Sequence, residues 1–130
     1  MTTLLRLGTR GSKLALTQAG LVRDALAAAV PALAAPDAIE IVAIRTTGDV
    51  IQDRPLSEAG GKGLFVKEIE EALLTQRIDA AVHSMKDMPV LQPAGLEIVA
   101  FLPREDARDV LIAGETQRIA DLRRGAPIST

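Results

Sequence analysis

The segment of residues 83–89 (HSMKDMP) holds the densest cluster of side chains able to do chemistry. Asp87 can accept hydrogen bonds from a cationic or N–H-rich ligand and can take part in proton transfer. Lys86 can pair with a ligand carboxylate, and Ser84 lies two residues before it. An ordinary surface loop with solvated charges is the alternative interpretation. His83 alone indicates little, because a His beside a strand end more often packs than catalyses.

A second cluster, residues 60–65 (GGKGLF), places three glycines around Lys62 just before a predicted helix. Such a turn can bring backbone N–H groups near an anion. It lacks the G-x-x-x-x-G-K-[ST] pattern of a nucleotide-binding P-loop. A flexible loop whose glycines serve turn geometry is the alternative interpretation.

The third cluster, residues 9–12 (TRGS), lies at the first predicted strand-to-helix turn. Arg10 and Ser12 would lie near a helix N-terminus, a position that favours anions. A plain helix cap beside an exposed Arg is the alternative interpretation. Together, the three clusters suit a small polycarboxylate ligand that also carries a positive or N–H-rich centre.

Each cluster follows a predicted strand or precedes a predicted helix. Residues 4–7 form an apolar run that ends at Gly8, and apolar positions then recur with helical spacing between Ser12 and Pro31. This order opens a βαβ unit, and ligands bind at the carboxyl edge of such sheets. The aperiodic stretch 46–63 predicts a functional or mobile loop. Further strands are expected at 39–44, 78–82, 96–102 and 110–113, and helical segments at 64–77 and 119–124.

Composition excludes several classes of protein. The 130 residues include one His and no Cys, which excludes disulfides, Cys-ligated zinc and thiol nucleophiles within them. Asp49 and Asp53 can cap turns, but without a third ligand they predict no metal site. A net charge of −2 argues against nucleic-acid binding through bulk charge. No apolar run approaches the roughly 20 residues of a membrane helix, and no signal peptide is evident, so we expect a cytoplasmic location.

The same clusters resemble the porphobilinogen deaminase (hydroxymethylbilane synthase) family, in order and over essentially the whole chain. The matching motifs are TRGSKLAL (9–16), Gly48–Asp49, GGKGLFVKE (60–68), AVHSMKDMP (81–89) and REDARD. The resemblance implies an enzyme that joins four porphobilinogen molecules into a linear tetrapyrrole, with loss of ammonia, on the route to haem. It implies a dipyrromethane cofactor, attached by a thioether to a Cys in a C-terminal domain. The implied fold is α/β, similar to type II periplasmic binding proteins, with a mixed, mostly parallel sheet, flanking helices and an interdomain active site.

The resemblance also implies roles at the cofactor. Asp87 matches the family's catalytic carboxylate, which contacts pyrrole N–H groups and stabilises the cationic azafulvene formed when ammonia leaves. Ser84 and Lys86 match residues that hold the side chains of the cofactor. Thr130 lies at the approach to a family Ser-Ser-Leu-Arg-Arg run, whose arginines bind cofactor carboxylates, and we expect it at the cofactor as well.

Four further residues are expected at the substrate. Arg10 and Ser12 match residues that bind the acetate and propionate groups of pyrroles. Lys62 and Phe65 match a mobile loop and helix start over the active site. Porphobilinogen is then the expected small-molecule partner, with neither nucleic acid nor membrane. The complete protein is expected to be a monomer, whereas this shorter chain can self-associate.

Two departures from the family pattern stand out. The attachment Cys is absent, as is the Ser-Ser-Leu-Arg-Arg run. By the family pattern, residues 1–102 are domain 1 without its returning strand, and residues 103–130 are the hinge and start of domain 2. We therefore expect a fragment of a longer chain that cannot turn over porphobilinogen alone. A stand-alone α/β module that binds a small carboxylate is the alternative.

Overall fold

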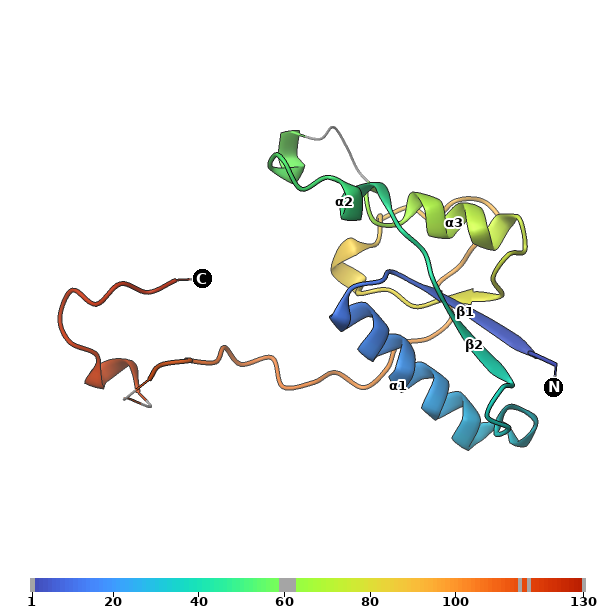
Figure 1. Ribbon diagram of the computed structural model, residues 1–130, viewed down its shortest axis with the longest axis horizontal. Coiled ribbons are helices and arrows are strands. Elements are labelled where there is room, and N and C mark those ends of the chain that lie inside the picture. Colours follow the sequence, from blue (N-terminus) through green and yellow to red (C-terminus); the bar gives the residue numbers. More distant parts are fainter. Residues whose placement is uncertain (1, 59–62, 115, 117, 130) are drawn as a thin grey trace. The chain divides into compact units, whose positions relative to one another are not determined.

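The structure is a computed structural model, and it describes residues 2–58, 63–114, 116 and 118–129. The chain divides into two compact units, Met1–Ala100 and Phe101–Thr130. All of the helices and strands in Figure 1 that carry labels belong to the first unit. Within the described residues, no helix has the length and apolar character needed to span a bilayer.

A three-stranded parallel sheet forms the centre of the first unit. β1 (Leu5–Thr9) lies between β2 (Ile39–Ala43) and β3 (Ala80–Ala81). α1 (Lys13–Ala29) connects β1 to β2, and α3 (Lys67–Leu74) precedes β3. Figure 1 shows α1 and α3 on opposite sides of the sheet, as right-handed crossovers in opposite directions require. The carboxyl ends of all three strands therefore meet at one edge.

The remaining elements are short. α2 (Thr47–Val50) is a single turn that follows β2. Turns of 3-10 helix occupy Pro31–Leu33, Leu56–Glu58, Met85–Asp87 and Ile119–Asp121. The last of these confirms the helical turn predicted within residues 119–124.

The first helix begins and ends where the sequence predicts. The Ser12 side chain accepts a hydrogen bond from the backbone N–H of Ala15 at 3.3 Å, so it satisfies a donor that would otherwise lack an intrahelical partner. At the other end, Val30 leaves the helical conformation and Pro31 starts a separate turn. The cap fixes the direction of the turn that carries Arg10.

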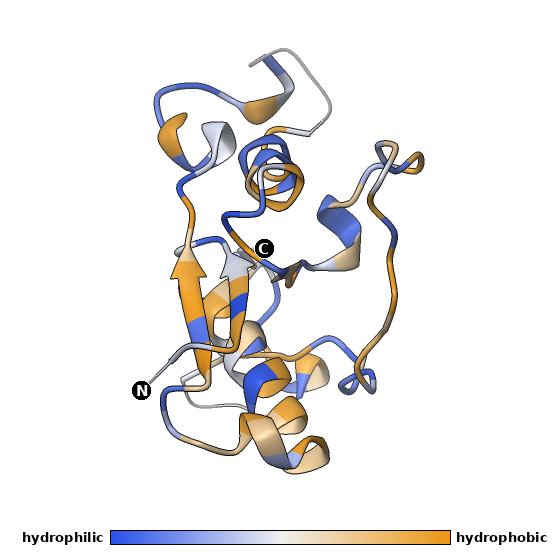
Figure 2. Ribbon diagram, turned by 90° about the vertical axis from the view of Figure 1, so that its right-hand side faces the viewer, coloured by the Kyte–Doolittle hydropathy of each residue, from blue (hydrophilic) through white to orange (hydrophobic). Residues whose placement is uncertain are grey.

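The core is aliphatic, as the near absence of aromatic residues predicts. Ile69 and Ala72 of α3 are fully buried against Ile44 and Ile78. Gly8 in β1 lies beneath Ile78, and a Cβ added there would overlap that side chain. Figure 2 shows hydrophobic residues along most of the strands and mixed colouring on the helices, as expected of strands covered by amphipathic helices.

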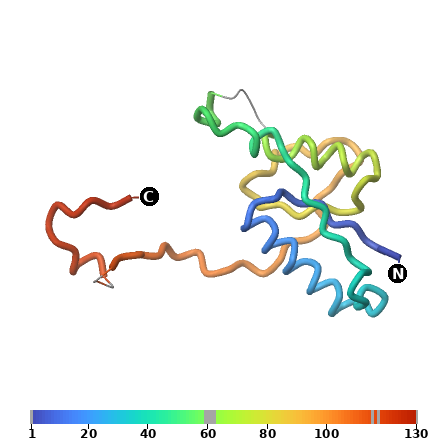
Figure 3. Tube along the Cα trace, viewed as in Figure 1, coloured from blue at the N-terminus to red at the C-terminus, as the bar shows by residue number. Residues whose placement is uncertain are grey.

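The predicted strands at 96–102 and 110–113 do not form. Figure 3 shows this part of the trace without helical turns, yet no neighbouring strand pairs with it among the described residues. Val99 and Ile112 are 82% and 94% exposed. An apolar pattern determines which face of a strand is buried, but a strand forms only where a neighbouring strand supplies backbone hydrogen bonds. The expected mixed sheet is also not seen, because the strands that the structure describes are all parallel.

The helix predicted at 64–77 is shorter than expected. It begins at Lys67 and ends at Leu74. Gln76 has a φ of 58°, in the left-handed region, and this conformation stops the helix. The chain then enters β3 through Ile78, which is buried.

An ion pair joins Arg6 in the central strand β1 to Asp79, the residue before β3. Arg6 donates from Nε to Asp79 Oδ2 at 3.0 Å and from Nη2 to Asp79 Oδ1 at 2.8 Å. The backbone N–H of Arg6 donates to the same carboxylate at 2.8 Å. These hydrogen bonds hold the pKa of Asp79 below its usual value.

Asp79→Asn is expected to flatten the acid dependence of stability. Because the folded-state pKa of Asp79 is lowered, the unfolded chain binds more protons in acid. The Asp79 carboxylate therefore contributes to the free energy of unfolding above its unfolded-state pKa of about 3.9. This contribution is lost as the pH falls from there through the folded-state pKa. Urea unfolding near pH 6 and near pH 3 tests this. The control is Asp24→Asn on α1, whose carboxylate pairs with the neighbouring Arg23 and with no other residue that the structure describes. Equal acid losses in wild type and Asp79→Asn would contradict the prediction.

Candidate functional site

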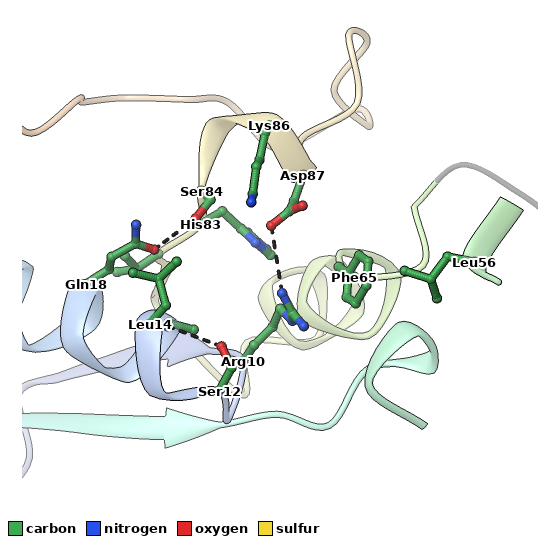
Figure 4. Close-up of a pocket in the computed structure, with 12 residues that line it drawn as sticks. Arg10, Ser12, Leu14, Gln18, Leu56, Phe65, His83, Ser84, Lys86 and Asp87 are labelled. Carbon is green, nitrogen blue, oxygen red and sulfur yellow. Dashed lines mark hydrogen bonds and ion pairs between the residues drawn. The ribbon is translucent and has the colours of Figure 1, made fainter. Parts of the chain in front are cut away.

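A cavity of about 380 Å³ lies at the carboxyl edge of the sheet. It is open on one side and is bordered by the turn after β1, the first turns of α1, the 3-10 turn that begins at Leu56, the approach to α3 and the segment after β3, as Figure 4 shows. Its volume falls within the range of small-molecule sites. The lining residues are Arg10, Ser12, Leu14, Ala15, Gln18, Leu56, Phe65, Val82, His83, Ser84, Lys86 and Asp87.

Arg10 is held from three directions. Its Nε and Nη2 donate to Asp49 Oδ1 at 3.0 and 2.5 Å. The ring of Phe65 lies 4.0 Å from the guanidinium carbon, a cation–π contact. The Nη1 atom faces Asp87, 3.8 Å from its Oδ2. The side chain of Arg10 is 21% exposed, so these interactions are screened less than surface contacts.

Asp87 ends a 3-10 turn after β3, and this turn directs its carboxylate toward Arg10 (Figure 4). Its backbone N–H donates to the carbonyl of Ser84 at 3.0 Å. No described residue donates a hydrogen bond to its carboxylate, and the contact with Arg10 is an ion pair beyond hydrogen-bond distance. The carboxylate is 18% exposed and keeps its acceptor positions for a ligand donor.

Lys86 and Ser84 lie on the same turn and line the same cavity. The Lys86 ammonium points into the space between His83 and Asp87 in Figure 4. Ser84 Oγ donates to Gln18 Oε1 at 3.0 Å, which links the segment after β3 to α1. Gln18 is therefore a wall residue of the cavity. Because Gln18 lies on the polar side of the predicted helix, the sequence alone does not predict its contact with Ser84.

His83 forms part of the wall of the cavity. Its Nε2 atom is buried without a partner among the described residues. Burial lowers the pKa of His83. The negative charge of Asp87 raises this pKa, and the positive charge of Arg10 lowers it. A neutral imidazole offers both a donor and an acceptor to a ligand.

Asp49 is expected from the sequence only to cap a turn, but in the structure it also holds Arg10. It completes the capping box of α2, whose N-cap residue is Thr46, as a turn-capping role predicts: its Oδ2 accepts from the backbone N–H and the Oγ1 of Thr46 at 3.2 and 2.7 Å. It also holds Arg10 through Oδ1. Burial alone would raise the pKa of Asp49, but the hydrogen bonds from Arg10 and Thr46 outweigh burial and lower it. The Gly48–Asp49 motif was the available signal.

Six of the residues expected at the site line this one cavity, and two others are not described. Lys62 and Thr130 lie outside the described residues. No cluster of metal-ligating side chains occurs within the described part of the chain. The residues that the cavity brings together are Arg10, Ser12, Phe65, Ser84, Lys86 and Asp87.

Comparison with known proteins places this chain in a family. A family model described as "Porphobilinogen deaminase, dipyromethane cofactor binding domain" matches residues 5–130. The porphobilinogen deaminase of Paracoccus denitrificans is 57% identical over 126 residues, which cover 97% of this chain and 40% of that protein. The chloroplastic porphobilinogen deaminase of Oryza sativa is 53% identical over 128 residues, covering 98% of this chain and 36% of that protein.

The bacterium Nitrobacter winogradskyi has a porphobilinogen deaminase that is 57% identical over 127 residues. That match includes 98% of this chain and 40% of the relative. It thus spans about two fifths of the length of these relatives, and the site described above lies within the shared region. The chain belongs to the porphobilinogen deaminase family.

Proposed function

We propose that the complete protein containing this chain joins four porphobilinogen molecules into a linear tetrapyrrole with release of ammonia. The observation that carries the proposal is the carboxylate of Asp87, which lies beside the cations Arg10 and Lys86 in one cavity. Porphobilinogen presents the complementary groups: two carboxylates, a pyrrole N–H and an amine that must leave.

Arg10 and Lys86 would bind the substrate carboxylates. Two of the N–H donors of Arg10 are taken by Asp49, and those on Nη1 face the cavity. A guanidinium whose orientation is already fixed loses little side-chain freedom when it binds a carboxylate. Ser12 lines the cavity beside it.

Asp87 would stabilise the cation that develops as ammonia leaves. A fixed negative charge helps most where positive charge appears in the transition state and where water is limited. The Asp87 carboxylate is partly buried, so its contact with water is limited, and its acceptor positions can also orient the pyrrole N–H. The same carboxylate can accept a hydrogen bond from the protonated amine, whose C–N bond breaks to release ammonia and leave the cation, since such groups act at hydrogen-bond distance.

The described residues fit a dipyrromethane cofactor. Its pyrrole N–H groups suit Asp87 and its carboxylates suit Lys86, while the unpartnered Nε2 of the buried His83 is a further polar contact in the wall. Ser84, Lys86 and Asp87 would hold it; when bound, it supplies the pyrrole to which the substrate units are added. Its attachment thiol must come from elsewhere, because the 130 residues contain no Cys.

We extend the proposal to the domain organisation. Residues 1–102 would form most of a first domain resembling type II periplasmic binding proteins, and residues 103–130 the hinge and start of a second. The complete protein would be a monomer. The division of the chain into compact units after Ala100 supports this domain boundary.

The first test is made on the complete gene product. Incubation with porphobilinogen should consume it and release hydroxymethylbilane and ammonia. Intact mass under denaturing conditions should show the added mass of two linked pyrroles. A protein without this adduct that binds porphobilinogen but does not consume it would instead be a small-carboxylate-binding module.

The 130-residue chain alone is expected to show no turnover. It lacks a thiol to hold the growing product. Purified chain and complete gene product, assayed side by side for hydroxymethylbilane, give the comparison. Release of product by the chain alone would refute this expectation.

Asp87→Asn in the complete protein is expected to lower kcat about 100-fold or more, with a smaller change in KM. The reason is that the amide cannot supply the negative charge that the developing cation requires. Steady-state assays measure both constants. The matched control Asp24→Asn changes an exposed carboxylate on α1 and should leave both unchanged. A kcat within about twofold of wild type for Asp87→Asn would exclude this role for Asp87.

Gly48→Ala is expected to raise KM several-fold. A Cβ at Gly48 would overlap three atoms of the Phe65 ring, so the ring must leave its position over Arg10. Gly20→Ala on α1 is the control, because no atom lies within 4 Å of the added Cβ there. The control should keep wild-type kinetics and gain a little helix stability. Unchanged kinetics in Gly48→Ala would show that the Phe65 contact does not matter for substrate binding.

A further inference from the structure

We propose that Asp49 is a positioning residue that holds the Arg10 guanidinium away from Asp87 and turned toward the cavity. This inference rests on the proposed function, because it names what keeps Asp87 available to the substrate. Asp49 does not line the cavity itself and would act only through Arg10.

The two carboxylate oxygens of Asp49 have separate tasks. Oδ1 accepts from Nε and Nη2 of Arg10 at 3.0 and 2.5 Å. Oδ2 accepts from the backbone N–H and the Oγ1 of Thr46 at 3.2 and 2.7 Å, and Thr46 is 1% exposed. The carboxylate is thus fixed to α2 at one oxygen and binds the guanidinium with the other. The backbone of α2 and its cap therefore determines where the Asp49 carboxylate holds the Arg10 guanidinium.

Arg10 lies between two carboxylates but bonds only one of them. Asp49 makes direct hydrogen bonds, whereas Asp87 remains at 3.8 Å. A guanidinium with one available carboxylate tends to form a close, charge-assisted pair with it. Without the charge of Asp49, Arg10 would close on Asp87. That pair would occupy the acceptor positions that the pyrrole N–H and the departing amine require.

Phe65 and Gly48 support the same arrangement. The Phe65 ring covers the guanidinium at 4.0 Å, and Gly48 leaves room for that ring. Gly48 and Asp49 are neighbours in α2, and the backbone N–H of Gly48 donates to the carbonyl of Leu64 at 2.6 Å. One short helix therefore places both the charge and the ring that orient Arg10.

The test compares three variants of the complete gene product. Asp49→Asn removes the charge and keeps the side-chain shape, and Asp49→Glu restores the charge. Thr46→Ala removes the capping hydroxyl and its methyl group but leaves the Asp49 charge and the backbone N–H that also donates to Asp49 Oδ2. We expect Asp49→Asn to lower kcat at least about tenfold, since small misplacements of site groups are costly. Asp49→Glu should recover part of that loss. Thr46→Ala should lower Tm like Asp49→Asn but keep kcat within about threefold of wild type.

A structural readout is independent of activity. In a crystal structure of Asp49→Asn, the separation of Arg10 Nη1 from Asp87 Oδ2 should fall from 3.8 Å to hydrogen-bond distance. An unchanged separation, or equal kcat losses in Asp49→Asn and Thr46→Ala, would overturn the inference and leave Asp49 as a helix cap only. An inactive wild-type protein would refute the proposed function instead, and the Arg10–Asp87 separation would still decide whether Asp49 holds Arg10.

Discussion

The site depends on the contact between the Arg10 guanidinium and the Asp49 carboxylate. In a partly buried cavity, charge–charge interactions are several-fold stronger than in bulk water, and a lone buried charge is costly. Arg10 is satisfied by the hydrogen bonds from its Nε and Nη2, while its Nη1 faces Asp87 at ion-pair distance. The cavity therefore keeps the Arg10 guanidinium and the Asp87 carboxylate side by side without a direct hydrogen bond between them.

The parallel sheet is the reason that these distant residues meet. Arg10 follows β1, Asp49 follows β2 and Asp87 follows β3, and parallel strands end at the same edge. Thr9 is buried at the end of β1 and donates to the carbonyl of Ala15 at 3.2 Å, which ties the turn carrying Arg10 to the start of α1. Chain topology thus brings the groups together, and local caps set their direction.

Much of this arrangement is predictable from local sequence, and the rest depends on tertiary partners. The spacing from Ser12 to Pro31 predicts α1 because caps and periodicity are local signals. The three motifs predict a shared cavity because each lies at a strand end or helix start. The choice of Arg10 as the partner of Asp49 has no local signal. Val99 and Ile112 likewise have a strand-like pattern, but whether a strand forms depends on a neighbour outside the pattern.

α2 shows how closely the fold and the site are coupled. A helix of four residues is too short to be stable alone, so tertiary contacts must hold it. Those contacts include the Asp49–Arg10 pair, the packing of Gly48 on Phe65, and Glu68, which accepts from the backbone N–H of Thr47 at 2.9 Å. The first two of these contacts also orient the guanidinium in the cavity. A change that removes either of those two must therefore move Arg10, because the same interaction holds the helix and aims the cation.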